Sequence, residues 1–493
     1  MGDYKKVRTR APVQIIHLSV LTMRPSFTLI VLALGLELTT GSAQSVIAIR
    51  GATTIDGTGA APRKGQTLIV RNERIEAIGP DDRMPVPAGA HVIDGKALYI
   101  VPGFIDTHAH YALGPVSIDR SKTPATLRMA YDHAASLASL RTLLGFGITT
   151  IRNPGGPARE SLAIRDSVKR RLMTGPRIFT AGEVLDATTA EGLVATVKTA
   201  EDVRRDVARQ AELGVDYVKL YALLNPEKVR AGIEEAHKRG VRAIGHLYLT
   251  SWTDAAKAGM DGFVHITPGS AALLPVRRRD EFQRRFRGTQ FMLEWFNYVD
   301  HASPEIKEMT AAMLQSKVTV DATLVTFEAM AWGDSDRITA NKDLRYAPRT
   351  ILEGWRNNFT LTTGWTPADY AEARKAWPKV LAFTKYLFDA GILLTAGTDM
   401  GNPWTVPGTS FHRELELHVA AGIPPLAVLA IATRNGAQSL GILDEVGTLE
   451  AGKRADLVAL EGDPVKDIRN TRRIAWVMQN GALLRPAELL REE

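Results

Sequence analysis

Two histidines close an apolar stretch in the sequence GFIDTHAH, which spans residues 103–110. The run that leads to them, Ile100–Ile105, has the composition of a buried β-strand. Residues two apart on a strand point to the same face, so His108 and His110 can reach one metal ion while Ala109 points away. The pattern therefore predicts a metal site at the end of a strand.

Strand-like and helix-like segments alternate from this stretch to about residue 440. The eight candidate strands are Ile100–Ile105, Ile148–Ile151, Arg177–Ala181, Tyr217–Tyr221, Arg242–His246, Gly262–Ile266, Val318–Leu324 and Ile392–Gly397. The clearest helical patterns are Glu201–Leu213, Glu227–Arg239, Pro304–Ser316 and Ala368–Ala390, the last with a kink or break expected at Pro378. This alternation predicts an α/β fold with a (β/α)8 TIM barrel over residues 99–440.

Short β runs separated by glycines occupy both ends of the chain, at residues 44–98 and 441–493. Neither end has enough apolar residues to form a core alone. We therefore expect one small β-sandwich domain built from both termini.

The first 43 residues have the pattern of an upstream segment and an export signal. Met23 and Arg24 precede ten apolar residues, Phe27–Leu36, and small residues lead to Ala43. We expect cleavage after Ala43 and a periplasmic or secreted protein, with a buried N-terminal helix as the alternative. Ten residues are too few to cross a bilayer, which takes roughly 20, so no stable membrane anchor is expected.

The amino-acid composition excludes several kinds of site and one class of partner. The 493 residues include no cysteine, which excludes disulfides, thiolate metal sites and cysteine nucleophiles. The net charge is +7, and the first 43 residues contribute five basic and two acidic side chains to it. The remaining excess is too small to indicate nucleic acid as a partner, so a small-molecule substrate is expected.

Three more candidate ligands lie at the C-terminal ends of other predicted strands. His246, His265 and Asp399 stand at the ends where active sites of βα-barrels form. Each alone has an ordinary structural interpretation, because a buried histidine or a helix-capping aspartate is common at such a position.

Lys219 lies inside the apolar strand Tyr217–Tyr221, where an unpaired ammonium would cost several kcal/mol. Two interpretations are open. The lysine is ion-paired inside the barrel, or its amine is carboxylated by CO2 and the carbamate bridges two divalent metals.

Together these motifs resemble the amidohydrolase superfamily over nearly all of the chain after residue 43. The resemblance includes the loop PGTSFHREL at residues 407–415 and the closing segment GTLEAGKRADL at residues 447–457. The similarity is greatest to the imidazolonepropionase-related branch, which contains metal-dependent Xaa-Pro and Xaa-Arg/Lys dipeptidases and ochratoxin-type amidases.

The resemblance implies two metal ions. It assigns His108, His110 and Asp399 to one ion, His246 and His265 to the other, and carboxylated Lys219 as the bridge. Zn2+ is the expected ion, although His and carboxylate ligands also suit Mn2+ and Co2+. Asn153 departs from the pattern, because relatives usually have Asp there. This difference bears on the hydrogen bonds around the metal ligands or on substrate choice, and not on the metals.

The expected activity is hydrolysis of an amide bond in a dipeptide or N-acyl amino acid by metal-activated water. Asp399 would take the proton of the water and pass it to the leaving amine. Tyr248 matches a tyrosine of dipeptidase-like relatives and could hold the oxyanion or a substrate carboxylate, or it could simply pack over the barrel mouth. The alternatives are an esterase, lactonase or phosphotriesterase on the same site, a mononuclear deaminase, and a metal-binding scaffold without activity.

Two insertions, residues 267–303 and 327–365, are too long for simple connections and are expected to be loops or lids. Six arginines fall within residues 277–287, as a solvated helix face or as a lid that attracts anionic substrates. The second insertion carries the aromatic residues Trp332, Tyr346, Trp355, Phe359 and Trp365. They could roof an apolar pocket or form a contact in a homo-oligomer.

Overall fold

The computed structural model describes residues 45–121, 126–285 and 288–490. The predicted upstream segment and signal peptide, residues 1–43, lie outside this part of the chain. Among the described residues, no helix has the length and apolar character needed to cross a membrane.

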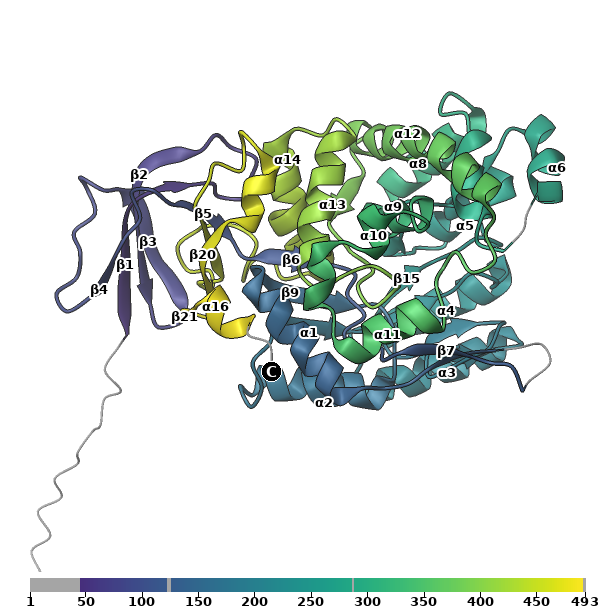
Figure 1. The fold of residues 1–493 in the computed structure, drawn as a ribbon, viewed down its shortest axis with the longest axis horizontal. Coiled ribbons are helices and arrows are strands. Elements are labelled where there is room, and N and C mark those ends of the chain that lie inside the picture. Colours follow the sequence, from purple (N-terminus) through teal and green to yellow (C-terminus); the bar gives the residue numbers. More distant parts are fainter. Residues whose placement is uncertain (1–44, 122–125, 286–287, 491–493) are drawn as a thin grey trace, which may run out of the picture. The chain divides into compact units, whose positions relative to one another are not determined.

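Strands from both ends of the chain form one eight-stranded sheet (Figure 1). Its strands are β1 (Val46–Thr54), β2 (Arg63–Arg71), β3 (Arg74–Pro80), β4 (His91–Asp94), β5 (Tyr99–Pro102), β19 (Leu457–Leu460), β20 (Ile474–Gln479) and β21 (Ala482–Leu484). The order is β21-β20-β19-β5-β1-β2-β3, with β4 paired to β1. The expected joining of the two ends is present, but the β-sandwich is not confirmed. Because β19 pairs with both β5 and β20, the two ends share one sheet rather than facing each other as two.

The first predicted strand is divided between two sheets. Residues 99–102 form β5 of the terminal sheet, and β6 (Phe104–Asp106) pairs instead with β9 (Ile148–Asn153). Gly103 lies between them, where a Cβ atom would come 2.1 Å from Thr149 Oγ1. The expectation of one continuous strand was wrong because the chain changes sheets at this close approach.

The central strands are parallel and fall into two sheets. The first has the order β10-β9-β6, with β10 at Arg177–Thr180. The second has the order β13-β11-β14-β15-β16-β17-β18, formed by Val194–Thr196, Val184–Asp186, Tyr217–Leu220, Arg242–Gly245, Gly262–Val264, Thr319–Asp321 and Leu393–Thr395. A separate three-stranded sheet joins β7 (Val116–Asp119), β8 (Thr126–Met129) and β12 (Ala190–Glu191).

The described strands do not form a closed barrel. A few backbone contacts link the two parallel sheets. Ala181 forms a bridge with Tyr217 at one margin, and the Thr107 N–H donates to the Ala396 carbonyl over 2.9 Å at the other. Many of these strands are only three or four residues long, so pairing stops before it becomes continuous around the ring. The α/β class is confirmed, and closure of the barrel is not shown.

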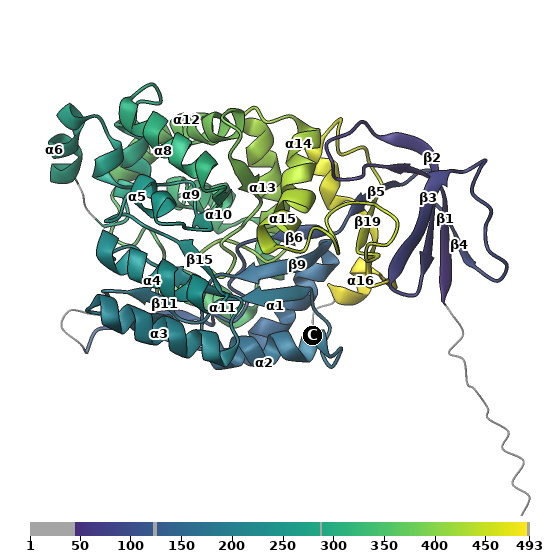
Figure 2. The ribbon, with the colours of Figure 1, turned by 180° about the vertical axis from the view of Figure 1, so that it is seen from behind.

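The predicted helices are present with small shifts at their ends. They are α3 (Ala200–Leu213), α4 (Pro226–Lys238), α8 (Pro304–Gln315) and α12 (Pro367–Asp389). Thr199 and Thr366 begin α3 and α12 with capping boxes, and Asn225 and Ser303 cap α4 and α8. Figure 2 shows α3 and α4 side by side along the second parallel sheet. The helix α12 continues through Pro378 without a break.

The remaining helices connect the strands or fill the insertions. They include α1 (His133–Gly145), α2 (Ala158–Lys169), α5 (Trp252–Lys257), α9 (Leu324–Ala331), α13 (Thr409–Ala420), α14 (Pro425–Ala430), α15 (Gly436–Leu440) and α16 (Pro486–Leu489). The insertions contain α6 (Val276–Arg285), α7 (Phe291–Glu294), α10 (Asp336–Thr339) and α11 (Arg349–Asn357). They are thus partly helical rather than loops.

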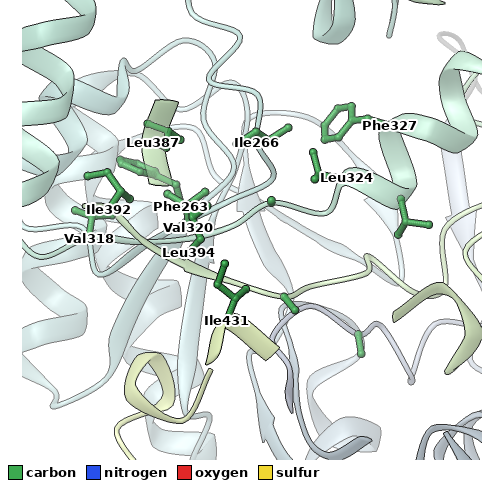
Figure 3. Packing of buried hydrophobic residues seen from close by; sticks show 14 of the residues in the cluster. Phe263, Ile266, Val318, Val320, Leu324, Phe327, Leu387, Ile392, Leu394 and Ile431 are labelled. Atoms are coloured by element: carbon green, nitrogen blue, oxygen red, sulfur yellow. The ribbon is translucent and has the colours of Figure 1, made fainter. Parts of the chain in front are cut away.

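Apolar side chains from the strands and from neighbouring helices form a buried core (Figure 3). Phe263, Val320 and Leu394, from three neighbouring strands, are each at most 1% exposed. Burying side chains of this size contributes roughly 1.5–3 kcal/mol each.

Candidate metal centre

The predicted ligands lie just beyond the carboxyl ends of parallel strands. His108 and His110 follow β6, His246 follows β15, His265 follows β16, and Asp399 comes four residues after β18. His265 and Asp399 have positive φ angles of 69° and 58°, which are strained for residues other than glycine.

Three of these side chains meet closely enough to hold one ion. His108, His265 and Asp399 each offer a ligand atom, and these atoms all lie within 4.8 Å of one another. His108 Nε2 lies 3.1 Å and His110 Nε2 lies 3.4 Å from Asp399 Oδ1. The ring of His246 lies 4.4 Å from that of His265, centroid to centroid. The structure thus brings four histidines and one aspartate into one buried cluster.

Hydrogen bonds to Nδ1 fix the orientation of the first two histidines. His108 Nδ1 lies 2.8 Å from Asp321 Oδ1, and His110 Nδ1 lies 2.7 Å from the Gly155 carbonyl oxygen. Carboxylate and carbonyl oxygens only accept, so both Nδ1 atoms donate, and Nε2 is the ring nitrogen directed at the Asp399 carboxylate in both residues. Histidines oriented in this way through Nδ1 are suited to metal binding through Nε2.

His246 and Tyr248 contact each other at the edge of the cluster. The tyrosine hydroxyl hydrogen-bonds His246 Nε2, and its ring packs edge-on against the imidazole and against Phe291. Tyr248 is 8% exposed. Aromatic packing was one of the two roles that the sequence allowed for Tyr248, and these ring contacts agree with it. The hydroxyl also contacts the candidate ligand His246.

Lys219 is a buried lysine of β14, and the described residues place no carboxylate within ion-pair distance of it. Its Nζ lies 5.4 Å from the centre of the Tyr221 ring, and its side chain is 2% exposed. Burial lowers the pKa of Lys219 to about 8, against the opposing charges of Asp399 and Asp321. Of the two interpretations of this lysine, the closely ion-paired one therefore has no support among these residues.

The donor set fits divalent metal ions. The His246 Nδ1 atom is buried without a hydrogen-bond partner among the described residues, a costly state that a metal bond would relieve. Burial holds the pKa of His110, His246 and His265 below the usual range, so these rings are neutral. Burial alone would raise the pKa of the Asp399 carboxyl, but the charge of His108 and hydrogen bonds from His108 and His110 hold it well below its usual range.

Sequence reasoning missed the residues that support this cluster. Asp321, at the end of β17, receives the His108 hydrogen bond and pairs with Arg152 Nη2 over 2.6 Å. Arg152 is itself 2% exposed. A buried arginine within the apolar strand β9 was the available signal, since such a charge requires a partner.

Asn153 lies in a hydrogen-bond network beside the cluster. Its amide donates to Ser161 Oγ and, over 3.0 Å, to Thr180 Oγ1. Its carbonyl oxygen accepts from the Gly155 N–H, and Gly155 in turn holds His110. Asn153 therefore contacts the candidate ligands only indirectly.

The insertions contribute differently to the surroundings of the cluster. Trp355, Pro348 and Ile351 of the second insertion line a small cavity together with His110 and Met400. Tyr346 instead packs on Phe146, Trp332 on Trp377 and Trp365 on Tyr370. In the first insertion, α6 buries only Phe282 and exposes most of its arginines to solvent.

A protein-family model matches most of the chain. Residues 99–484 match the amidohydrolase family. The chain belongs to the amidohydrolase family. Membership confirms the resemblance inferred from the motifs and makes the protein an enzyme that hydrolyses C–N bonds.

Relatives similar over most of their length agree with this assignment. The chain is 26% identical over 433 residues to imidazolonepropionase from Agrobacterium fabrum, covering 82% of this chain and 85% of that one. It is 22% identical over 448 residues to ochratoxinase from Aspergillus niger, covering 86% and 84%. A shorter match, 47% identical over 68 residues, joins 14% of this chain to 13% of N-acyl-D-aspartate deacylase from Alcaligenes xylosoxydans xylosoxydans.

Among solved structures, a putative prolidase from Bifidobacterium longum has a similar fold. The TM-score is 0.65 at 25% identity, and the match covers 90% of this chain and 97% of that one.

Proposed function

We propose that this protein is a binuclear metal-dependent hydrolase that cleaves an amide bond in a dipeptide or an N-acyl amino acid. The observation that carries the proposal is the buried cluster of His108, His265 and Asp399, together with the neighbouring His246 Nδ1, which lacks a hydrogen-bond partner among the described residues. Full-length similarity to imidazolonepropionase and ochratoxinase supports the C–N bond chemistry.

His108, His110 and Asp399 would hold one ion, and His246 and His265 the other. Lys219 would bridge them as a carbamate, because an ammonium cannot bind a cation. The low pKa of about 8 supports this modification, since only the neutral amine reacts with CO2. We propose Zn2+ as the native ion, while the same ligands suit Mn2+ and Co2+.

The ions, when bound, would supply Lewis-acid activation of a water molecule and of the substrate carbonyl. Asp399 is placed to accept a proton, because its carboxylate is ionised and lies at the centre of the cluster. It would then pass this proton to the leaving amine. The Tyr248 hydroxyl, which the structure places at His246 Nε2, would donate to the developing oxyanion or to a substrate carboxylate.

The eight strands β6, β9, β10, β14, β15, β16, β17 and β18 would form the (β/α)8 barrel around this site. The backbone links at Ala181 and Thr107 support closure, because they join the two parallel sheets at both margins. We also propose export of the protein after removal of residues 1–43. N-terminal sequencing of secreted material tests this, and a mature start well before Gln44 would contradict it.

A hydrolysis screen tests the activity directly. The Zn2+-loaded protein would be offered N-acyl amino acids, dipeptides and aryl esters, with metal content counted per chain. Amide cleavage with about two ions per chain is expected. Cleavage of esters alone would favour the esterase or lactonase alternative, and about one ion per chain with deamination would favour the mononuclear deaminase.

A further inference from the structure

The helix α9 begins at Leu324, shortly after β17 ends at Asp321. Thr323 is the residue that immediately precedes the helix. Thr323 has φ 46° and ψ 40°, a left-handed conformation that is strained for a β-branched residue. A threonine at this position ordinarily accepts a hydrogen bond from the helix backbone through its hydroxyl. Here Thr323 makes no such bond.

The hydroxyl of Thr323 is used for a candidate ligand instead. Its Oγ1 lies 2.8 Å from His265 Nδ1, and both residues are buried. With Nδ1 engaged in this way, Nε2 is the ring nitrogen that remains available to a metal. The orientation of His265 therefore depends on the conformation of Thr323.

A carboxyl group from a different helix replaces the missing cap. Glu414 of α13 accepts a hydrogen bond from the Val325 N–H over 2.8 Å at the start of α9. Its side chain is completely buried, and its other oxygen has no hydrogen-bond partner among the described residues. Burial raises the pKa of Glu414 well above its usual range.

We propose that Glu414 is a positioning residue for His265. It caps α9 from outside and so frees the Thr323 hydroxyl to hold the imidazole. The proposal rests on the function proposed above, because it takes His265 to be a metal ligand. It predicts that removing the Glu414 acceptor weakens metal binding through Thr323, although Glu414 hydrogen-bonds no candidate ligand.

The test measures Zn2+ affinity by competition with a chelator, independently of turnover. Thr323→Val is expected to lower affinity about 10- to 100-fold, while Thr323→Ser retains the hydroxyl and most of the affinity. Glu414→Met is expected to lower affinity about tenfold, while Glu414→Gln retains an acceptor for Val325 and stays within about threefold. Thr384→Val is the matched control, because the buried Thr384 hydroxyl donates to Val380 within α12.

A double mutant separates positioning from general destabilisation. If Glu414 acts through Thr323, the affinity of Thr323→Val/Glu414→Met is no lower than that of Thr323→Val. If Glu414→Met retains parental affinity, or if the two effects multiply independently, the inference is wrong. Should Glu414→Met fail to fold, Glu414→Asp withdraws the acceptor by one methylene and is judged by the same cycle.

His265→Ala distinguishes this inference from the proposed function. Unchanged Zn2+ affinity in His265→Ala would show that the ligand set itself is wrong. Weaker binding in His265→Ala with parental binding in Thr323→Val would overturn the positioning inference alone.

Discussion

Asp321 Oδ1 lies 2.8 Å from His108 Nδ1, while Oδ2 of the same carboxylate lies 2.6 Å from Arg152 Nη2. One fully buried aspartate thus orients a candidate metal ligand and neutralises a buried arginine. The metal cluster and the stability of the core depend on the same side chain.

Asp321→Asn should damage both properties. Without the negative charge, Arg152 is left as an uncompensated buried cation, which costs roughly 3–5 kcal/mol of unfolding free energy. Metal affinity should fall roughly 10- to 100-fold, because His108 loses its charged acceptor. Urea denaturation and chelator competition measure the two effects. Asp456→Asn is the control: the buried Asp456 carboxylate pairs with Arg177 over 2.9 Å, and neither residue belongs to the cluster or to the contacts that orient it, so this variant should lose stability but not metal affinity.

Substituting the ligands should abolish turnover without unfolding the protein. His108→Ala and Asp399→Ala each remove a group from the cluster, whereas the apolar core is formed by other residues such as Phe263 and Val320. Circular dichroism and steady-state rates on the best substrate of the screen check this. Activity within tenfold of the parent in either variant would refute the assignment.

Lys219→Ala should lose metal and activity together. A short carboxylic acid can occupy the space that the side chain leaves, and it supplies two oxygens suited to bridging ions roughly 3.5–4 Å apart. Adding such an acid, or bicarbonate, to the variant should therefore restore part of both properties. Two tightly bound ions and near-parental turnover in the unsupplemented variant would show that Lys219 is not a bridge.

The protein should lose stability as the pH falls below about 6.5. Burial and the charge of Arg472 hold the pKa of His412 at about 3, and burial holds that of His418 at about 4, against 6.5 when exposed. Below about pH 6.5, these two histidines therefore bind protons in the unfolded chain but not in the folded chain. Each histidine lowers the unfolding free energy by up to about 1.4 kcal/mol per pH unit between these values. Urea denaturation at pH 7.5, 6.5 and 5.5 should show a shallower loss for His412→Gln than for the parent, and equal slopes would contradict this origin.

The arginines of α6 should have little influence on catalysis. Arg277, Arg284 and Arg285 are exposed, and the helix is anchored by Phe282, which matches the solvated-face interpretation of this segment. Arg284→Gln/Arg285→Gln should leave kcat/KM and its salt dependence within about twofold. A tenfold decrease at low salt, lost at high salt, would instead favour a lid that attracts anionic substrates.

The sequence was sufficient to place the candidate ligands because their positions follow from local pattern. His108, His246 and His265 each follow a short apolar run, and parallel strands end at one edge, so the runs alone predict that the side chains meet. The strand that precedes Asp399 could be read in the same way.

The supporting residues could not be found by this reasoning, because their partners are distant in the chain. Arg152 and Asp321 are separated by 169 positions, and Val325 and Glu414 by 89. No periodicity indicates which buried acid meets which buried donor. The division of the first strand at Gly103 was missed for a related reason, since it depends on the close approach of Thr149.

The pairing of β5 with β19 constrains how the protein can be made. The strand Tyr99–Pro102 leaves the ribosome early, but its neighbour Leu457–Leu460 is synthesised near the end of the chain. Until then β5 keeps an unpaired edge, the kind of surface through which β proteins aggregate. A nascent chain that stalls before Leu457, or a truncation that removes it, would therefore expose this edge next to residues that lead straight into the metal centre.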